Sequence, residues 1–271
     1  MYENMFDVNG RVVIITGGAG LIGSRYALVL SEAGSHSIVA DINEQAAVEI
    51  ASSVGGAKAM GIGVDITKPA SVKNLVSRVI GEFGRIDGLV NNAALDPKFD
   101  TVYTGEHLSS FENLPLDVWN NSLAVNLTGM FLCTQAVVPY MLEKGKGAIV
   151  NISSTYGMCG PDQRLYEKDD PKSSPTYKPV HYTVTKSAVF GFTKYLATYY
   201  GQKGIRANTL TLGGVFNNHD AEFVRRYSQR TPMGRMADRD EYCGALLFLL
   251  SDASSYMTGA NLVVDGGWTA W

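Results

Sequence analysis

The sequence predicts an α/β fold built on a doubly wound, parallel, seven-stranded sheet with helices on both faces. Short apolar runs alternate with longer segments of helical periodicity, and most of these runs lack the alternation of half-exposed strands. A glycine-rich turn follows the first apolar run directly. The 271 residues, 45% of them hydrophobic, suit one domain spanning 1–271. We therefore expect a single-domain Rossmann fold.

The elements follow from this rhythm in chain order. Short apolar runs predict strands at 12–16, 37–40, 59–64, 88–91, 148–152, 207–212 and 262–264. Helical periodicity between them predicts helices at 21–33, 44–53, 70–83, 117–142, 182–200 and 239–251, and His219 is expected at a further helix start. Such alternation implies right-handed crossovers between parallel strands. Two long connections, 95–116 and 155–180, exceed the usual loop length and are predicted as substrate loops rather than plain surface loops.

Composition narrows the classes of function. The net charge is −3 and the 23 basic residues are scattered, which argues against a nucleic-acid partner. The N-terminal segment lacks the features of a signal peptide, and we expect no membrane-spanning stretch and a cytoplasmic location. An odd number of widely spaced cysteines favours free thiols in a reducing compartment: Cys133, Cys159 and Cys243. The four histidines lack metal-ligand spacing, so no metal is expected.

The run from Val12 to Gly23 predicts a dinucleotide site. An apolar strand ends in a glycine turn, and the helix after it aims its N-terminus at a pyrophosphate. Asp41 closes the next apolar segment 18 positions after Gly23, where a carboxylate holds the adenosine ribose. It would repel a 2′-phosphate, and no basic residue follows it, which favours NAD over NADP. The alternative for Asp41 is a helix N-cap, a role that Asn43 can fill instead.

A second carboxylate, Asp65, follows the third predicted strand. It either accepts a hydrogen bond from the adenine amino group or starts a turn. The place of Asp65 in the sequence, directly after a predicted strand, favours the contact with adenine.

A tyrosine and a lysine four residues apart supply the predicted chemistry. On a helix Tyr182 and Lys186 share a face, and a nearby ammonium lowers the pKa of a phenol towards use as an acid or base. Ser153 and Ser154 end the strand before this helix, at the sheet edge where ligands bind. The same spacing in Tyr140/Lys144 and Tyr199/Lys203 falls at helix C-termini, where a structural role is expected. Asn126 lies mid-helix, which indicates a role for its side chain in bending the helix or anchoring a water.

Together these residues resemble the short-chain dehydrogenase/reductase family, in its compact single-domain branch. The matching pieces are Thr16-Gly17 to Gly23, Asp65, Asn91-Asn92-Ala93, Asn126, Ser154, Tyr182 to Lys186, Pro232 to Arg235 and Val264 to Gly267. The resemblance implies transfer of a hydride and a proton, with Ser154 positioning the oxygen, Tyr182 exchanging its proton, Lys186 binding the ribose and Asn126 holding a relay water. It implies cofactor contacts from Gly17, Gly20, Leu21, Ile22, Gly23, Asp41, Ile42, Asp65, Ile66, Asn92, Ala93, Ala94, Tyr182, Lys186 and Val215. It also implies a homotetramer or a dimer.

The chain departs from the family pattern at four places. The glycine spacing around Gly20 and Leu21 is similar to that of sugar-nucleotide epimerases, and Ala94 replaces a usual glycine. Leu212-Gly213 and Asn217 replace a usual Pro-Gly and threonine. Ser154 and Tyr182 are 28 residues apart, and the extra segment 160–179 is polar.

These features predict an NAD-dependent oxidoreductase that interconverts an alcohol and a ketone on a polar, sugar-like substrate, because an oily substrate needs an apolar wall. The alternatives are a 3-oxoacyl thioester reductase and a non-catalytic NAD-sensing protein.

Overall fold

The computed structural model describes residues 4–55, 58–96, 110–167 and 176–271. Its sheet has seven parallel strands in the order β3-β2-β1-β4-β5-β6-β7. The strands are β1 Val12–Thr16, β2 His36–Asp41, β3 Met60–Gly63, β4 Gly88–Asn91, β5 Gly147–Ser154, β6 Ile205–Leu212 and β7 Asn261–Val264. The predicted fold class is confirmed. Because β2 and β4 lie on opposite sides of β1, the strand order reverses there and opens a crevice at the carboxyl ends.

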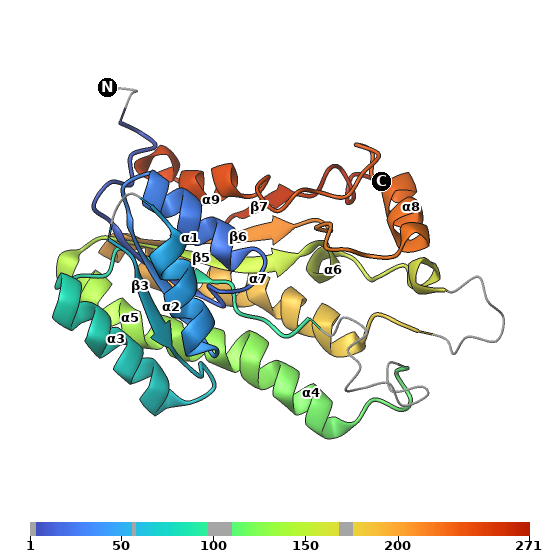
Figure 1. Ribbon diagram of the computed structural model, residues 1–271, viewed down its shortest axis with the longest axis horizontal. Coiled ribbons are helices and arrows are strands. Elements are labelled where there is room, and N and C mark those ends of the chain that lie inside the picture. Colours follow the sequence, from blue (N-terminus) through green and yellow to red (C-terminus); the bar gives the residue numbers. More distant parts are fainter. Residues whose placement is uncertain (1–3, 56–57, 97–109, 168–175) are drawn as a thin grey trace.

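Helices cover both faces of the sheet (Figure 1). The helices are α1 Gly23–Glu32, α2 Glu44–Ser53, α3 Pro69–Phe83, α4 Leu116–Leu123, α5 Met130–Lys144, α6 Thr155–Met158, α7 Val180–Tyr200, α8 Ala221–Arg230 and α9 Cys243–Leu250. Val12 and Ile14 face a core shared with α3, α5 and α7, whereas Val13 and Ile15 face one shared with α1 and α9. Burial on both faces explains why β1 reads as an unbroken apolar run.

The helix predicted over 117–142 is interrupted. A π-helical turn, Ala124–Gly129, joins α4 to α5, and Asn126 lies within it. By length and composition the whole segment 116–144 is apolar enough to cross a membrane, contrary to the prediction that no such stretch exists. Its second half packs against α3 and the sheet, as the core helix of a globular domain does.

Two other helix starts differ from expectation. The helix predicted from residue 239 begins at Cys243, and α8 begins at Ala221 rather than at His219. The cap of α8 is Asp220, whose carboxylate accepts a hydrogen bond from Phe223 N at 2.8 Å.

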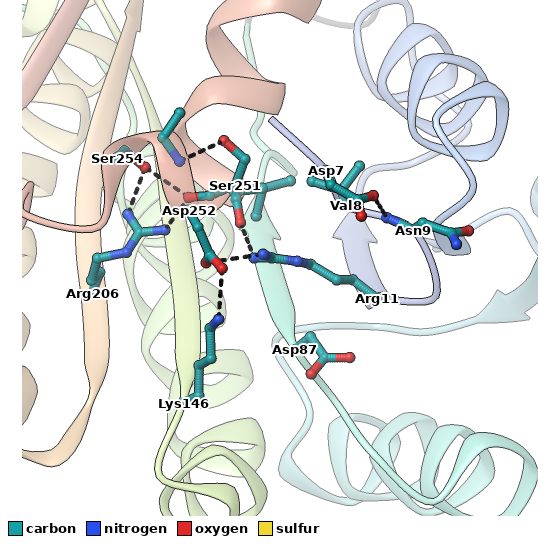
Figure 2. A network of polar contacts seen from close by, with 12 residues as sticks. Asp7, Val8, Asn9, Arg11, Asp87, Lys146, Arg206, Ser251, Asp252 and Ser254 are labelled. Carbon is teal, nitrogen blue, oxygen red and sulfur yellow. Dashed lines mark hydrogen bonds and ion pairs between the residues drawn. The ribbon is translucent and has the colours of Figure 1, made fainter. Parts of the chain in front are cut away.

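A polar network joins the segment before β1 to the segment after α9, at the amino ends of the strands (Figure 2). Arg11, next to β1, donates to Asp252 at 2.9 Å, and Lys146, next to β5, donates to the same carboxylate at 2.9 Å. Arg206 in β6 donates to Ser254 Oγ and to Leu249 O, each at 2.9 Å. These contacts stabilise the edge of the sheet opposite the crevice, and leave the carboxyl edge for ligands.

Candidate active site

A cavity of about 550 Å³ lies at the carboxyl ends of the strands. Its wall contains most of the residues predicted for the site: Gly17, Gly20, Leu21, Ile22, Asp41, Ile42, Asp65, Ile66, Asn92, Ala93, Ala94, Ser154, Tyr182, Lys186 and Val215. Two predicted residues, Gly23 and Asn126, lie behind the wall and do not line it. Asn217, one of the departures from the family pattern, is exposed and also lies outside the wall.

The glycine turn forms a cradle that any side chain would fill. Gly17 has a φ of +62°, and a Cβ there would lie 2.8 Å from Ala93 Cα. A Cβ on Gly23 would lie 2.2 Å from Gly17 O, so Gly23 allows α1 to begin against the turn. The side-chain amide of Asn92 donates to Thr16 O and Gly17 O, each at 3.0 Å. The turn is thus held from two sides in a shape that fits a pyrophosphate.

Asp41 lies at the end of β2 with its carboxylate in the cavity wall. One oxygen accepts a hydrogen bond from Ala19 N at 3.0 Å, which joins β2 to the glycine turn. The cap of α2 is Asn43, whose side chain accepts from Ala46 N at 3.1 Å. The N-cap alternative for Asp41 is therefore wrong. The other interpretation, a carboxylate that binds the adenosine ribose, stays a prediction.

Asp65 serves a turn. Its Oδ1 accepts hydrogen bonds from Thr67 Oγ1 at 2.6 Å and from Thr67 N at 2.9 Å. These bonds hold the pKa of the carboxyl below its usual value, although burial opposes them. The turn alternative is therefore realised, and because Asp65 also lines the cavity, the adenine contact stays a prediction.

Tyr182 and Lys186 lie in the first half of α7, with the ammonium 5.8 Å from the centroid of the tyrosine ring. Lys186 is 6% exposed, and its Nζ donates to Ile152 O in β5 at 3.1 Å. Ser153 Oγ donates to Lys186 O at 2.8 Å. The helix is thereby fixed to the strand that ends in Ser154. The pairing inferred from a four-residue spacing is present and rigidly held.

The phenol of Tyr182 is not acidic in this structure. Burial raises its pKa far above the usual value, and the negative charge of Asp96 adds to the rise. A hydrogen bond with Ser154 opposes the shift but does not cancel it. The pKa of the phenol is therefore raised rather than lowered as predicted, and the Lys186 ammonium bonds to Ile152 O instead. Burial also lowers the pKa of Lys186 to about 8.

The two serines divide their roles. Ser153 is 2% exposed and bonds to the backbone of α7, whereas Ser154 caps α6 by accepting from Tyr156 N at 3.2 Å. Ser154 also lies close enough to Tyr182 to lower the pKa of its phenol. Of the two serines, Ser154 has the less buried side chain, and its contact with a substrate oxygen stays a prediction.

Asn126 uses its side chain to hold the backbone. Its Oδ1 accepts from Leu95 N at 2.7 Å, and its Nδ2 donates to Leu95 O and to Thr185 Oγ1, each at 3.1 Å. This accounts for an asparagine within a helix. The amide of Asn126 bonds to Thr185, the residue before Lys186 in α7. Among the described residues it makes no direct bond to the lysine itself.

Aromatic side chains form the wall opposite the glycine turn. They are Tyr156, Tyr166, Tyr182, Phe223 and Tyr227, with Trp268 stacked on Tyr227 at a centroid distance of 4.1 Å. From the inserted segment, Leu165 and Tyr166 turn inwards and are buried, whereas Asp162 pairs with Arg164 and Arg230 outside the cavity. The inserted segment is therefore polar in composition but contributes aromatic and apolar side chains to the interior beside the cavity. The described parts of the two connections predicted as substrate loops do reach the cavity, through Leu95 and Tyr166; residues 97–109 and 168–175 lie outside the described residues.

Two charged residues of the site were missed by sequence reasoning. Asp96 and Lys178 line the cavity and form an ion pair across 82 positions of the chain. Neither belongs to a motif, and only the position of each in a long connection hinted at a role. By contrast, the lysines of the two excluded tyrosine–lysine pairs lie away from the cavity. Lys144 forms an ion pair with Asp87, and the ammonium of Lys203 lies over the ring of Tyr199.

The described residues hold no group of three or more histidine, cysteine, aspartate or glutamate side chains that would bind a metal ion.

Comparison with known proteins gives the family. Residues 18–269 match the family model described as enoyl-(acyl carrier protein) reductase, adh_short_C2. The chain belongs to the short-chain dehydrogenase/reductase family. Among its curated relatives are D-threitol dehydrogenase of Mycolicibacterium smegmatis, 35% identical over 97% of this chain and 95% of the relative, and 2,5-dichloro-2,5-cyclohexadiene-1,4-diol dehydrogenase LinX of Sphingobium indicum, 31% identical over 96% of each.

Solved structures of the short-chain dehydrogenase/reductase family agree with the fold. A gluconate 5-dehydrogenase from Burkholderia cenocepacia, crystallised with NADP and tartrate, superposes with a TM-score of 0.83 at 31% identity over the full length of both chains. A short-chain dehydrogenase/reductase from Mycobacterium marinum gives the same TM-score and identity over 98% of each chain. The chain is therefore an NAD(P)-dependent oxidoreductase acting on alcohols.

Proposed function

We propose that the protein is an NAD-preferring dehydrogenase that interconverts a secondary alcohol and a ketone on a small polyol or related sugar-like substrate. The observation that carries the proposal is the placement of Tyr182. Its phenol lies near Ser154, which lowers its pKa, the Lys186 ammonium lies 5.8 Å from its ring centroid, and the glycine turn lines the same cavity.

The cradle supports a dinucleotide as cofactor. Gly17 and Gly23 let the turn pack closely on Ala93 and on α1, and α1 points its N-terminus at the turn, which suits a pyrophosphate. Asp41 suits the two hydroxyls of an adenosine ribose and disfavours a 2′-phosphate. Lys186 would hold the nicotinamide ribose, and Asn92, Ala93 and Val215 would make further contacts with the cofactor. When bound, the nicotinamide takes up or supplies the hydride.

The protein's own groups handle the proton. A phenol is protonated at neutral pH, so Tyr182 has a proton to donate to a carbonyl oxygen. Ser154 donates a second hydrogen bond to that oxygen and fixes its position. The Lys186 ammonium stabilises the phenolate left behind. Oxidation of an alcohol runs through the same groups in reverse, and the relay water at Asn126 stays a prediction.

The relatives support a hydroxyl-rich substrate, and an aromatic wall can accommodate one. Aromatic rings pack against the C–H faces of a small polyol, and their hydroxyls offer hydrogen bonds. The relatives named for threitol, for gluconate and for a cyclic diol act on molecules of this kind.

A substrate panel tests the proposal. Threitol, gluconate and 2,3-butanediol are assayed with NAD⁺ and NADP⁺ by absorbance at 340 nm, using the wild type, Tyr182→Phe and Tyr199→Phe. Tyr199 is the matched control, since it also lies near a lysine on α7 but far from the cavity. We expect Tyr182→Phe to lose about 10²- to 10⁴-fold in kcat while still binding NADH, and Tyr199→Phe to match the wild type.

Two other results redirect the assignment. Turnover of acetoacetyl-CoA with NADPH, and none of the polyols, indicates the 3-oxoacyl thioester reductase. NADH binding without any Tyr182-dependent turnover indicates a cofactor-sensing protein.

The proposal includes a homotetramer. Three large aromatic side chains on α5 and α7 are exposed, Phe131 at 45%, Tyr195 at 60% and Tyr199 at 53%, as expected of helices that pack against a second copy. Sedimentation velocity tests this: the wild type is expected at the mass of four chains, and Phe131→Asp with Tyr195→Asp at a smaller mass.

A further inference from the structure

The Asp96–Lys178 ion pair lies directly beside Tyr182. Lys178 Nζ is 4.0 Å from the centroid of the Tyr182 ring and 6.0 Å from that of Tyr156. Its side chain is 10% exposed, and that of Asp96 is 36% exposed. Both residues line the cavity, so the pair borders the space beside the phenol, with Lys178 the more deeply buried of the two.

Neighbouring residues hold both members of the pair in place. The side chain of Gln163 makes two hydrogen bonds with the backbone of Lys178, accepting from its N at 2.9 Å and donating to its O at 3.2 Å. On the other side, Asn126 binds both the N and the O of Leu95, the residue before Asp96. Each charge is therefore anchored through its backbone by an amide side chain, which is the arrangement that a preorganised binding site requires.

The chemistry of the pair suits a hydroxyl group. Asp96 neutralises Lys178, so together they offer one strong donor and one strong acceptor without net charge. A hydroxyl accepts from the ammonium and donates to the carboxylate at the same time. A carboxylate accepts from Lys178 only, and Asp96 repels it. An ion pair with one partly exposed member adds little to folding stability by itself, which leaves both charges available to a ligand in the cavity.

We propose that Lys178 and Asp96 bind the hydroxyl next to the carbon that is oxidised, and so select neutral vicinal polyols. The inference rests on the proposed function, since it names the substrate feature that the same site recognises. It makes both residues specificity determinants for the alcohol dehydrogenase reaction, in which Tyr182 exchanges the proton.

A pair of substrates that differ by one hydroxyl tests the proposal. The ratio of kcat/KM for 2,3-butanediol to kcat/KM for 2-butanol is measured for the wild type, Lys178→Met and Lys203→Met. Lys203 is the matched control because it lies 4.6 Å from the centroid of the Tyr199 ring, at the far end of α7. We expect a wild-type ratio of about 10 to 100 that falls by about 10-fold or more in Lys178→Met. Lys203→Met keeps the wild-type ratio.

The second variant, Asp96→Asn, tests the preference for neutral over anionic substrates. It leaves Lys178 uncompensated, so the ratio of kcat/KM for gluconate to kcat/KM for threitol is expected to rise by about 10-fold or more. NADH binding, followed by fluorescence, checks that each variant is folded. If Lys178→Met does not bind NADH, the Asp96→Asn ratio alone decides.

The outcomes separate the two proposals. Equal kcat/KM values for 2,3-butanediol and 2-butanol in the wild type, or unchanged ratios in both variants, overturn the role of the pair and leave the dehydrogenase intact. A parallel fall with both alcohols in Lys178→Met shows that the pair only tethers the loop to α7, and also overturns it. Absence of Tyr182-dependent turnover with every alcohol overturns the proposed function itself.

Discussion

The ammonium of Lys186 donates a hydrogen bond to the backbone carbonyl of Ile152 at 3.1 Å, which ties the middle of the site to the strand that ends in Ser154. The side chain is nearly excluded from water, and burial lowers the pKa of its ammonium to about 8. Lys186 is therefore charged below about pH 8 and increasingly neutral above it.

This pKa predicts the alkaline limit of ketone reduction. Because the ammonium stabilises the phenolate that forms when Tyr182 gives up its proton, kcat/KM for reduction should fall as the pH rises above about 8. Lys186→Arg carries a charge that does not titrate in this range, so its remaining activity should keep a flat alkaline limb. Profiles from pH 6 to 10 with NADH and a diketone check this. The same fall in Lys186→Arg would assign the limit to another group.

The contact between Gly23 and Gly17 predicts a selective loss of cofactor binding. In Gly23→Ala the new methyl meets Gly17 O at 2.2 Å, so the turn or α1 must shift. We expect the Kd for NADH to rise by about 10-fold or more, with a loss of about 1–3 kcal/mol in the free energy of unfolding. The control is Gly81→Ala in α3, where nothing lies within 4 Å and a helical alanine should stabilise by about 0.5–1 kcal/mol. Fluorescence titration and urea unfolding supply the two readouts, and normal NADH binding by Gly23→Ala contradicts the cradle.

The charge of Asp41 predicts the choice between the two dinucleotides. Replacing it in Asp41→Asn removes a negative charge from the position meant for the adenosine ribose. The ratio of kcat/KM for NAD⁺ to kcat/KM for NADP⁺ should fall by about 10-fold or more, because repulsion of a 2′-phosphate is lost. Glu49→Gln, on the exposed side of α2, removes a charge of the same sign nearby and should leave the ratio unchanged. A ratio that does not move in Asp41→Asn assigns the preference elsewhere.

Local sequence patterns were enough to predict the strands and the residues of the site that lie on or directly after regular elements. The strands are buried on both faces and so read as apolar runs, and Asp41 follows directly from the end of one of them. Tyr182 and Lys186 lie four residues apart on one helix, so their proximity needs no knowledge of the tertiary fold. Ser154 follows in the same way from the end of β5.

The parts that were missed depend on contacts between distant segments. Asp96 and Lys178 meet only because two long connections converge over the cavity. The pKa of Tyr182 depends on how far its neighbours exclude water, and spacing along a helix says nothing of that. Leu165 and Tyr166 lie in a polar stretch of sequence, and their burial in an aromatic cluster with Tyr227 reverses the impression that composition gives.

Asp87 predicts a pH-dependent contribution to stability far from the site. Its side chain is 8% exposed and accepts hydrogen bonds from Val12 N at 2.9 Å and Arg85 Nε at 2.8 Å, and from Lys144. Burial alone would raise the pKa of this carboxyl, but these bonds outweigh burial and hold the pKa below its usual value. Since the folded-state pKa is lowered, the stabilisation is complete above the unfolded value of about 4 and is lost as the pH falls through the folded value.

Asp87→Asn should therefore cost about 1–3 kcal/mol at pH 7, because three donors lose a charged acceptor. The cost should stay constant down to about pH 5 and shrink as the wild-type carboxylate takes up its proton at lower pH. Asp240→Asn is the matched control, since its ion pair with Arg25 is exposed and should contribute less than about 1 kcal/mol. Urea unfolding of both variants at pH 7, 5 and 3.5 gives the comparison. A cost for Asp87→Asn that equals that of Asp240→Asn, or that is the same at all three pH values, contradicts the stabilising role of the buried carboxylate.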